Sequence, residues 1–225
     1  MKHATAQGAG PSQTALGITD LMTSLVVVFI LLFAAQFSKV SSAAQSELQD
    51  NKEDVRTALR GHIQRLGLSL DADPRDPLAL VIVVPEDRLT FEFGKSTLSP
   101  AADQFLVDAL PFYVGALCGP LRDKIDSLAI EGHTDDYGSD AFNLKLSQER
   151  SLAVMVKGLE VIQAAKPYSY QCFQEITSAT GRGRQDLMYE STAVVNREKS
   201  RRVIFKIRLR SAEQRHQIER SATGL

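Results

Sequence analysis

Asp20 is the residue of this chain whose surroundings most directly suggest chemistry. It is the sole ionisable residue between Leu16 and Phe37, in a stretch that is otherwise almost entirely apolar. A helix of this length crosses roughly 30 Å, the thickness of a bilayer core. A carboxylate there costs about 3 kcal/mol, and the cost falls when the group is protonated or reaches a watery partner. Such an acid can take up a proton and release it again.

Two other interpretations of this segment stay open. Asp20 lies near one end of the apolar run, so it could rest among lipid headgroups without any transport role. The run could instead be a cleaved secretory signal, because Ser-Ala-Ala at 42–44 is typical of a cleavage site. The length of the run, its interruption by Asp20 and the sparse positive charge before it (Lys2 and His3) argue against a signal. We therefore expect a transmembrane helix over 16–38 after a flexible tail over 1–15.

The composition limits the partners that the chain can have. The net charge is −1, tryptophan is absent and aromatic residues make up 7% of the chain. Neither a basic field nor a base-stacking surface for nucleic acid is therefore indicated. Cys118 and Cys172 belong to no Cys-x-x-Cys pair or metal-ligand cluster. They could form one disulfide in an oxidising compartment, or remain two buried, reduced thiols.

Hydrophobic periodicity predicts one α/β domain after a helical linker. A thin apolar stripe predicts a helix over 41–70 within a linker over 39–77, and it suits either a dimer contact or packing on the same chain's domain. The prolines and aspartates of 71–77 interrupt the chain.

Within the domain, over 78–210, strands and helices are expected to alternate. Strands are predicted at 78–84, 88–93, 125–132, 173–180 and 201–209. Helices are predicted at 99–117, 139–159 and 191–199. This order predicts a sandwich of helices on one face of a mixed sheet. A polar tail over 211–225 follows, as a frayed helix.

The segment 130–151 carries the most specific motif of the chain. Gly-His-Thr-Asp is followed by a glycine and then by Asn-x-x-Leu-Ser-x-x-Arg. The pattern is filled by Gly132, His133, Thr134, Asp135, Gly138, Asn143, Leu146, Ser147 and Arg150. Over roughly 78–210 the chain resembles the peptidoglycan-binding domain of the OmpA and MotB families. The later segments 181–183 and 196–203 also match the pattern of these families. The resemblance implies an OmpA-like sheet and a binding function, without enzymatic activity or a cofactor.

Asp135 and Arg150 are the candidate ligand-binding pair. Asp135 falls in the loop after a strand and Arg150 inside the next helix, so two opposite charges could hold a zwitterion. In the family, the matching positions bind the diamino acid of a peptidoglycan stem peptide. We expect Asp135 to take its ammonium and Arg150 its carboxylate bidentately, with hydrogen-bonding support from Asn143 and Thr134. The alternative is a surface ion pair that only orders the loop.

The chain departs from the family pattern near its end. The proline that usually follows the Gly-x-Gly loop is missing, with Gln185 and Asp186 nearby, and Ser200 stands where the family often has an asparagine. Arg201 is a further candidate ligand contact, or else a solvated charge at a strand end. His133 has no second His or Cys at metal-ligand spacing, so we interpret it as a packing residue and expect no metal site. A nucleophile elbow is also missing from the sequence.

An apolar segment bearing Asp-Leu-Met-Thr ahead of this domain resembles the MotB class of motor stator subunits. Asp20 matches the ion-carrying acid of that class, and Thr23 keeps its nearby hydroxyl. The resemblance implies a homodimer inside a pentameric-type ring of a MotA-like or ZorA-like membrane partner. It also implies the bacterial inner membrane, with the N-terminus cytoplasmic and the domain periplasmic. Protons are the expected ion, with sodium as the rival.

The short spacing between the apolar segment and the binding domain is similar to the stator subunits of Zorya anti-phage systems. We therefore predict a wall-anchored, ion-driven motor subunit with a role in defence. A flagellar-type stator subunit and a passive membrane-to-wall anchor, which would leave Asp20 without a task, are the alternatives. A wall-active enzyme is the weakest of the alternatives, because the sequence shows no recognisable set of catalytic residues.

Overall fold

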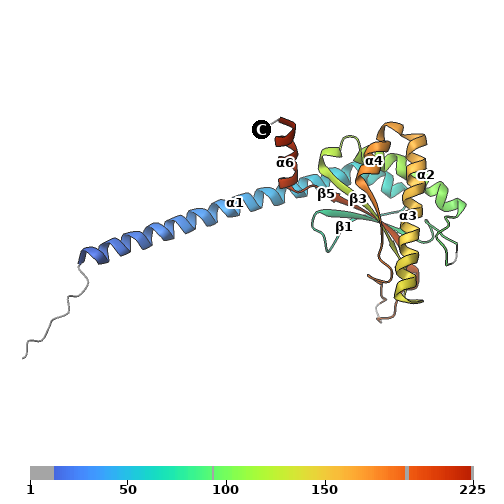
Figure 1. Ribbon diagram of the computed structural model, residues 1–225, viewed down its shortest axis with the longest axis horizontal. Coiled ribbons are helices and arrows are strands. Elements are labelled where there is room, and N and C mark those ends of the chain that lie inside the picture. Colours follow the sequence, from blue (N-terminus) through green and yellow to red (C-terminus); the bar gives the residue numbers. More distant parts are fainter. Residues whose placement is uncertain (1–12, 93, 191–192, 224–225) are drawn as a thin grey trace, which may run out of the picture. The chain divides into compact units, whose positions relative to one another are not determined.

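The computed structural model describes residues 13–92, 94–190 and 193–223, without the side chains of 13–20, 216, 219, 222 and 223. The chain divides into two compact units, the first ending at Glu47 and the second beginning at Leu48. The helices drawn in Figure 1 are α1 (Gln13–Arg65), α2 (Pro100–Leu117), α3 (Asp140–Ala165), α4 (Tyr170–Ile176), α5 (Arg197–Ser200) and α6 (Ala212–Thr223). The strands are β1 (Leu70–Ala72), β2 (Ala79–Pro85), β3 (Ile125–His133), β4 (Thr177–Gly181) and β5 (Arg202–Leu209).

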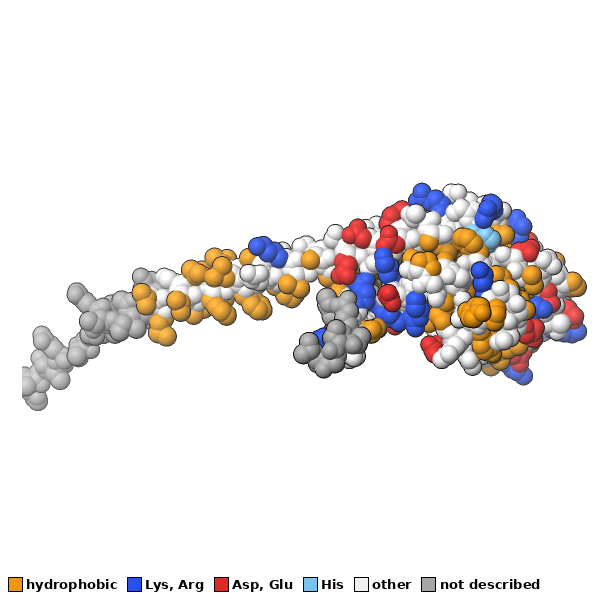
Figure 2. Space-filling model, turned by 90° about the horizontal axis from the view of Figure 1, so that it is seen from above, with side chains coloured by type: hydrophobic (Ala, Val, Ile, Leu, Met, Phe, Trp, Pro, Cys, Tyr) orange, Lys and Arg blue, Asp and Glu red, His pale blue; other side chains and the backbone are white. Residues whose placement is uncertain are grey.

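The described part of the N-terminal unit is the first stretch of helix α1. Its large apolar side chains from Leu21 to Phe33 are all more than half exposed, and Figure 2 shows hydrophobic side chains along this helix. From Leu21 onward the helix is long and apolar enough to cross a membrane, judged by length and composition. The helix begins at Gln13, inside the predicted tail, and it continues unbroken past residue 38, where we had placed the end of the transmembrane segment. The first 12 residues of that tail lie outside the described part.

Helix α1 ends at Arg65, five residues before the predicted end at 70, and a glycine closes it. Gly67 has a φ of 69°, in the left-handed region that glycine adopts at little cost. The amide of Gly67 donates to the carbonyl of Gln64 at 3.0 Å, and that of Leu68 donates to Ile63 at 3.0 Å. These two bonds form a Schellman motif, which closes the helix. Beyond it, Leu70 begins strand β1, in a stretch for which the sequence predicted no strand.

The C-terminal unit contains a five-stranded mixed sheet in the order β1-β2-β5-β3-β4. Strand β2 runs antiparallel to both β1 and β5, and β3 runs antiparallel to β5 but parallel to β4. Figure 1 shows α2, α3 and α4 on the same side of the sheet. The predicted α/β sandwich with helices on one face is therefore confirmed.

Strand β5 shows why the helices cover only one face. Val203, Phe205, Ile207 and Leu209 are buried in the core, whereas the residues between them are only partly buried. Side chains alternate between the two faces of a strand, so the apolar set faces the helices. On the opposite face Lys206 pairs with Asp73 of the β1–β2 connection at 2.6 Å.

The apolar stripe late in α1 packs on the domain of its own chain. Val55, Leu59 and Ile63 are 0%, 0% and 2% exposed and belong to the main core. Packing on the same domain was one of the two alternatives for this stripe. Burying three such side chains contributes about 1.5 to 3 kcal/mol each, which ties this end of the helix to the sheet.

The predicted strand at 88–93 is wrong. Phe91 forms only an isolated bridge with Leu98, and Leu89 donates its amide back to the Pro85 carbonyl at 3.2 Å. Both neighbouring positions beside β2 are occupied by β1 and β5. The alternating apolar residues Leu89 and Phe91 are nevertheless buried, because this irregular loop packs onto the core.

Two further expected elements change near the end of the domain. The segment predicted as a strand over 173–180 begins as helix α4, and the strand β4 starts only at Thr177. Phe173 and Ile176 are both buried, and their spacing of three suits a helical turn. Of the helix predicted at 191–199, residues 191 and 192 lie outside the described part, and the described residues form only the short helix α5, with the Asn196 side chain accepting from the Lys199 amide at 2.9 Å as its N-cap.

The two cysteines form one disulfide, between Cys118 at the end of α2 and Cys172 in α4. They are separated by 54 positions. The disulfide was one of the two alternatives for these cysteines.

Two glycines allow α3 to approach the ends of β3 and β4. A Cβ atom at Gly132 would lie 2.3 Å from the Ser147 carbonyl oxygen, and one at Gly181 would lie 2.5 Å from the Gln148 nitrogen. Both contacts are with the backbone of α3, so any larger residue would push the helix away. This close approach places the first turns of α3 beside the loop that follows β3.

Candidate functional site

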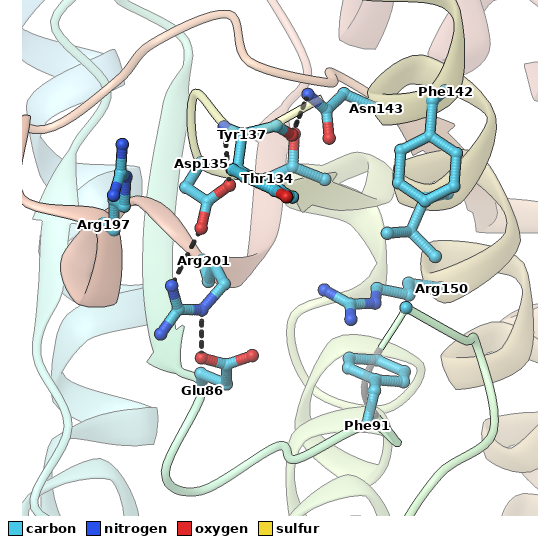
Figure 3. A pocket seen from close by; sticks show the side chains of 12 residues that line it. Glu86, Phe91, Thr134, Asp135, Tyr137, Phe142, Asn143, Arg150, Arg197 and Arg201 are labelled. Atoms are coloured by element: carbon cyan, nitrogen blue, oxygen red, sulfur yellow. Dashed lines mark hydrogen bonds and ion pairs between the residues drawn. The ribbon is translucent and has the colours of Figure 1, made fainter. Parts of the chain in front are cut away.

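A cavity of about 560 Å³ lies where the loop after β3 meets α3 and the turn after β2. Its size is within the range of small-molecule sites. Figure 3 shows the side chains that line it. The cavity brings together all five residues expected to bind peptidoglycan, which are Thr134, Asp135, Asn143, Arg150 and Arg201. It also contains Glu86, Phe91, Tyr137, Phe142 and Arg197, which the sequence did not single out.

The loop after β3 is held in place by backbone hydrogen bonds. The Thr134 amide donates to the Gly183 carbonyl at 2.9 Å, and the Tyr137 amide donates to Oδ1 of Asp135 at 3.0 Å. Asn143 is 2% exposed, and its Nδ2 donates to the Tyr137 carbonyl at 2.9 Å. Asn143 therefore fixes the loop to α3 and supports the site indirectly.

Thr134 is a buried polar residue with an unsatisfied side chain. It is 3% exposed, and its Oγ1 has no hydrogen-bond partner among the described residues. Buried hydroxyls are normally hydrogen-bonded. Thr134 lines the cavity, but its Oγ1 is itself buried, so a ligand could reach this hydroxyl only after the side chain moves.

Arg150 is a buried cation on the α3 side of the cavity. It is 7% exposed, its Nε donates to the Lys95 carbonyl at 3.0 Å, and its Cζ lies 4.9 Å from the centroid of the Phe91 ring. It forms no ion pair with a carboxylate of the described residues. Burial lowers the pKa of the Arg150 guanidinium, but an arginine remains charged in proteins. Its terminal nitrogens are thus left for an anion.

Asp135 lies across the cavity from Arg150 and pairs with a different arginine. Its Oδ2 accepts from Nη1 of Arg201 at 2.8 Å, and Nε of Arg201 donates to Oε2 of Glu86. Burial opposes the charge on Arg201, but these two carboxylates together raise its pKa. Arg201 is therefore held at the cavity by two carboxylates, and a contact between Arg201 and a ligand stays a prediction.

A second ion pair lies at the rim of the cavity. Nε of Arg197 donates to Oδ1 of Asp136 at 2.7 Å, and the terminal Nη2 reaches Oδ2 at 3.4 Å. Hydrogen bonding from Arg197 lowers the pKa of Asp136. Both groups are close to solvent, so we assign little stability to this pair.

His133 is packed beneath the site. It is 2% exposed, its Nδ1 lies 3.3 Å from the Gln185 carbonyl oxygen, and its Nε2 lies 3.8 Å from Oε2 of Glu131. In the described ranges, no three His, Cys, Asp or Glu side chains gather closely enough to hold a metal ion.

The positions that depart from the family motif have structural partners of their own. Oγ of Ser200 accepts from the Met188 amide at 2.9 Å and donates to the Asn196 carbonyl at 2.7 Å. Asp186 has a φ of 66° and pairs with Arg75. These contacts fix the loop after β4 without the usual proline.

The two residues expected to carry the ion are not part of this cavity. Asp20 and Thr23 both lie in the N-terminal part of α1. The Asp20 side chain falls outside the described residues.

Comparison with known proteins identifies the domain. Residues 90–201 match the OmpA family. The chain is 29% identical over 154 residues to Zorya protein ZorB of Escherichia coli O139:H28, covering 64% of this chain and 60% of that protein. It is 36% identical over 96 residues to outer membrane protein P5 of Haemophilus influenzae, covering 41% of this chain and 25% of P5. The chain thus spans less than two thirds of these curated relatives.

A solved structure gives the same result for the fold. The MotB-like protein of Desulfovibrio vulgaris superposes with a TM-score of 0.54 at 24% identity, over 74% of this chain and 96% of that one. The chain therefore carries an OmpA-like domain, and its fold is that of the MotB-like protein from Desulfovibrio vulgaris. Its apolar N-terminal helix together with a domain of this type fits a single-pass inner-membrane protein.

Ser147 should be essential to the shape of the site, whereas its neighbour Ser151 should not. Oγ of Ser147 accepts from the buried Gly183 amide at 2.8 Å, and that glycine carries the carbonyl that holds Thr134. Oγ of Ser151 donates only within its own helix, to Gln148 at 3.0 Å. We expect Ser147→Ala to lower the free energy of unfolding in urea by about 1 to 3 kcal/mol, since it leaves a buried amide unpaired.

Ser151→Ala is the matched control, because both serines are 0% exposed. It should cost clearly less than Ser147→Ala. Equal losses for the two variants would contradict the role given to the Ser147–Gly183 bond.

Proposed function

We propose that this MotB-like chain is the membrane stator subunit of a proton-driven motor, anchored to peptidoglycan by its periplasmic OmpA-like domain and acting in anti-phage defence. The observation that carries the wall-binding part is the buried Arg150, whose terminal nitrogens face a cavity with Asp135 on its other side. The membrane and motor parts are supported by the apolar helix, by Asp20 within it and by the likeness to a Zorya protein.

The ligand proposed for the cavity is the diamino acid of a peptidoglycan stem peptide. Arg150 takes its carboxylate, because Arg201 is already paired with two carboxylates, through Nε to Glu86 and Nη1 to Asp135, whereas Arg150 has no ion pair among the described residues. Asp135 takes its ammonium, because each carboxylate oxygen has a second lone pair beyond its present bond. The Thr134 hydroxyl, which is buried in the free protein, supplies a further hydrogen bond once its side chain turns toward the ligand, and Asn143 holds the loop.

The proposed topology places the N-terminus in the cytoplasm and the domain in the periplasm. The Cys118–Cys172 disulfide supports this, because disulfides persist in oxidising compartments such as the periplasm. The positive charges that flank the apolar segment barely distinguish the two orientations, because Lys2 precedes the segment and Lys39 follows it.

In the proposed mechanism Asp20 carries the proton. Desolvation in the membrane favours its protonated form, and a water path or a partner hydroxyl favours its release. Two copies of the chain would stand within a pentameric ring of a MotA-like partner, which steps as the proton passes. Thr23 is proposed as a nearby hydroxyl on the same helix, and sodium is the rival ion.

Wall binding is tested with a stem tripeptide that ends in diaminopimelate, titrated calorimetrically into the full chain in detergent. We expect Arg150→Ala to weaken binding about 100-fold, because it removes a charge-assisted bidentate contact. Arg150→Lys keeps the charge but loses the two parallel donors of the guanidinium, so we expect binding to weaken about tenfold. Arg184→Ala is the control, since Arg184 is exposed, pairs with Asp140 and does not line the cavity. Equal affinities for wild type and both Arg150 variants would refute the assignment.

Ion transport is tested in cells challenged with phage and scored for motility in parallel. We expect Asp20→Asn to abolish protection while membrane expression is retained, because asparagine cannot exchange a proton. Asp50→Asn, on the exposed face of the same helix, should protect like wild type, and Asp135→Ala should lose protection through failed anchoring. Normal protection by Asp20→Asn beside loss in Asp135→Ala would make the protein a passive anchor. Loss of motility instead of protection would indicate a flagellar-type subunit.

A further inference from the structure

Glu86 is an acidic residue of the cavity that the OmpA-type motif does not include. It directly follows β2, and its backbone carbonyl accepts from Oγ1 of Thr90 at 2.9 Å. Its side chain is 24% exposed and reaches Nε of Arg201. Figure 3 shows Arg201 between Glu86 and Asp135, with Arg150 on the opposite side of the cavity.

The guanidinium of Arg201 is shared between two carboxylates. Glu86 occupies its Nε, and Asp135 receives a single bond from Nη1. A bidentate arginine–carboxylate pair is stronger and would use two parallel donors on one carboxylate. Glu86 therefore takes the Nε side of the Arg201 guanidinium, and Asp135 shares that cation with it through one bond.

The charges of this group favour a cationic ligand atom. Glu86 and Asp135 contribute two negative charges and Arg201 one positive charge, which leaves one net negative charge. Arg197 and Asp136 at the rim form their own ion pair, so their charges cancel and add no net charge to this group. Arg150, across the cavity, is the cation left for the ligand's carboxylate.

Without the charge of Glu86 the balance would change. Arg201 and Asp135 would form a neutral pair, with little net attraction for an ammonium group. The Nε donor of Arg201, released from Glu86, could then bond a ligand carboxylate. The cavity would then favour ligands that carry a carboxylate alone over those that carry an ammonium as well.

We infer that Glu86 is a specificity-determining residue of the wall-binding site: by neutralising Arg201, it leaves the charge of Asp135 available to the ammonium of the diamino acid. This inference rests on the proposed function of the same cavity. It assigns the ammonium subsite to two carboxylates and one arginine, where the sequence motif indicated a single aspartate.

The test compares two stem tripeptides that differ by one group. One ends in diaminopimelate, and the other ends in 2-aminopimelate, which keeps the far carboxylate but lacks the ammonium beside it. Binding of each to the full chain in detergent is measured by calorimetry. For Glu86→Gln we expect affinity for the diaminopimelate peptide to fall about tenfold, with affinity for the aminopimelate peptide unchanged or increased. The preference between the two peptides is therefore the readout.

Two variants control for folding and for general charge effects. Asp87→Asn makes the same charge change one residue away, at an exposed side chain that does not line the cavity, and should keep the wild-type preference. Glu86→Asp keeps the charge and should keep most of that preference. Thermal unfolding of every variant confirms that it is folded.

The outcomes separate this inference from the proposed function. If wild type prefers the diaminopimelate peptide and Glu86→Gln keeps that preference, or weakens both peptides equally, the role of Glu86 is overturned while wall binding stands. If wild type itself shows no preference for the ammonium-bearing peptide, the proposed ligand and the role of Glu86 both fall.

Discussion

A buried guanidinium with no carboxylate partner among the described residues is expensive for a protein, and Arg150 is such a group. Taking a charge out of water costs several kcal/mol unless other interactions compensate. Here the Phe91 ring, against one face of the guanidinium, and the Lys95 carbonyl, which accepts from its Nε, offset part of that cost. Both lie between β2 and α2, and Phe91 belongs to the stretch in which sequence periodicity wrongly predicted a strand. The same contacts that make Arg150 tolerable also fix the direction in which its remaining donors point.

The other half of the site depends on how closely α3 approaches the sheet. Gly132 and Gly181 have no Cβ at the points where the backbone of α3 passes β3 and β4. Ser147 then bridges α3 to the loop after β4, and that loop in turn holds Thr134. Asp135 and Arg150 are therefore placed across one cavity by backbone contacts, while their side chains remain available to a ligand.

Much of the site could be predicted from the sequence, because a strand, a loop and the helix after it are close in the chain. All of the expected wall-binding residues line the cavity, and the Ser99 and Ser139 N-caps begin helices where periodicity placed them. The missed residue that changes the charge of the site is non-local. Glu86 is 115 positions from Arg201, and nothing in its own segment indicates that partner. The wrong strand at 88–93 also has a non-local cause. The alternation of Leu89 and Phe91 indicates that both are buried, but it cannot indicate that β1 already pairs with the edge of β2.

The central claim is that the two charged ends of a diamino acid are held by Arg150 and by Asp135. The most direct measurement is a crystal structure of the chain with the diaminopimelate-ending stem peptide bound. The account predicts the carboxylate within hydrogen-bonding distance of the terminal nitrogens of Arg150, the ammonium beside Asp135, and Arg201 still bonded to Glu86. A ligand bound outside this cavity, or with its carboxylate on Arg201 and Arg150 left unpaired, would contradict it.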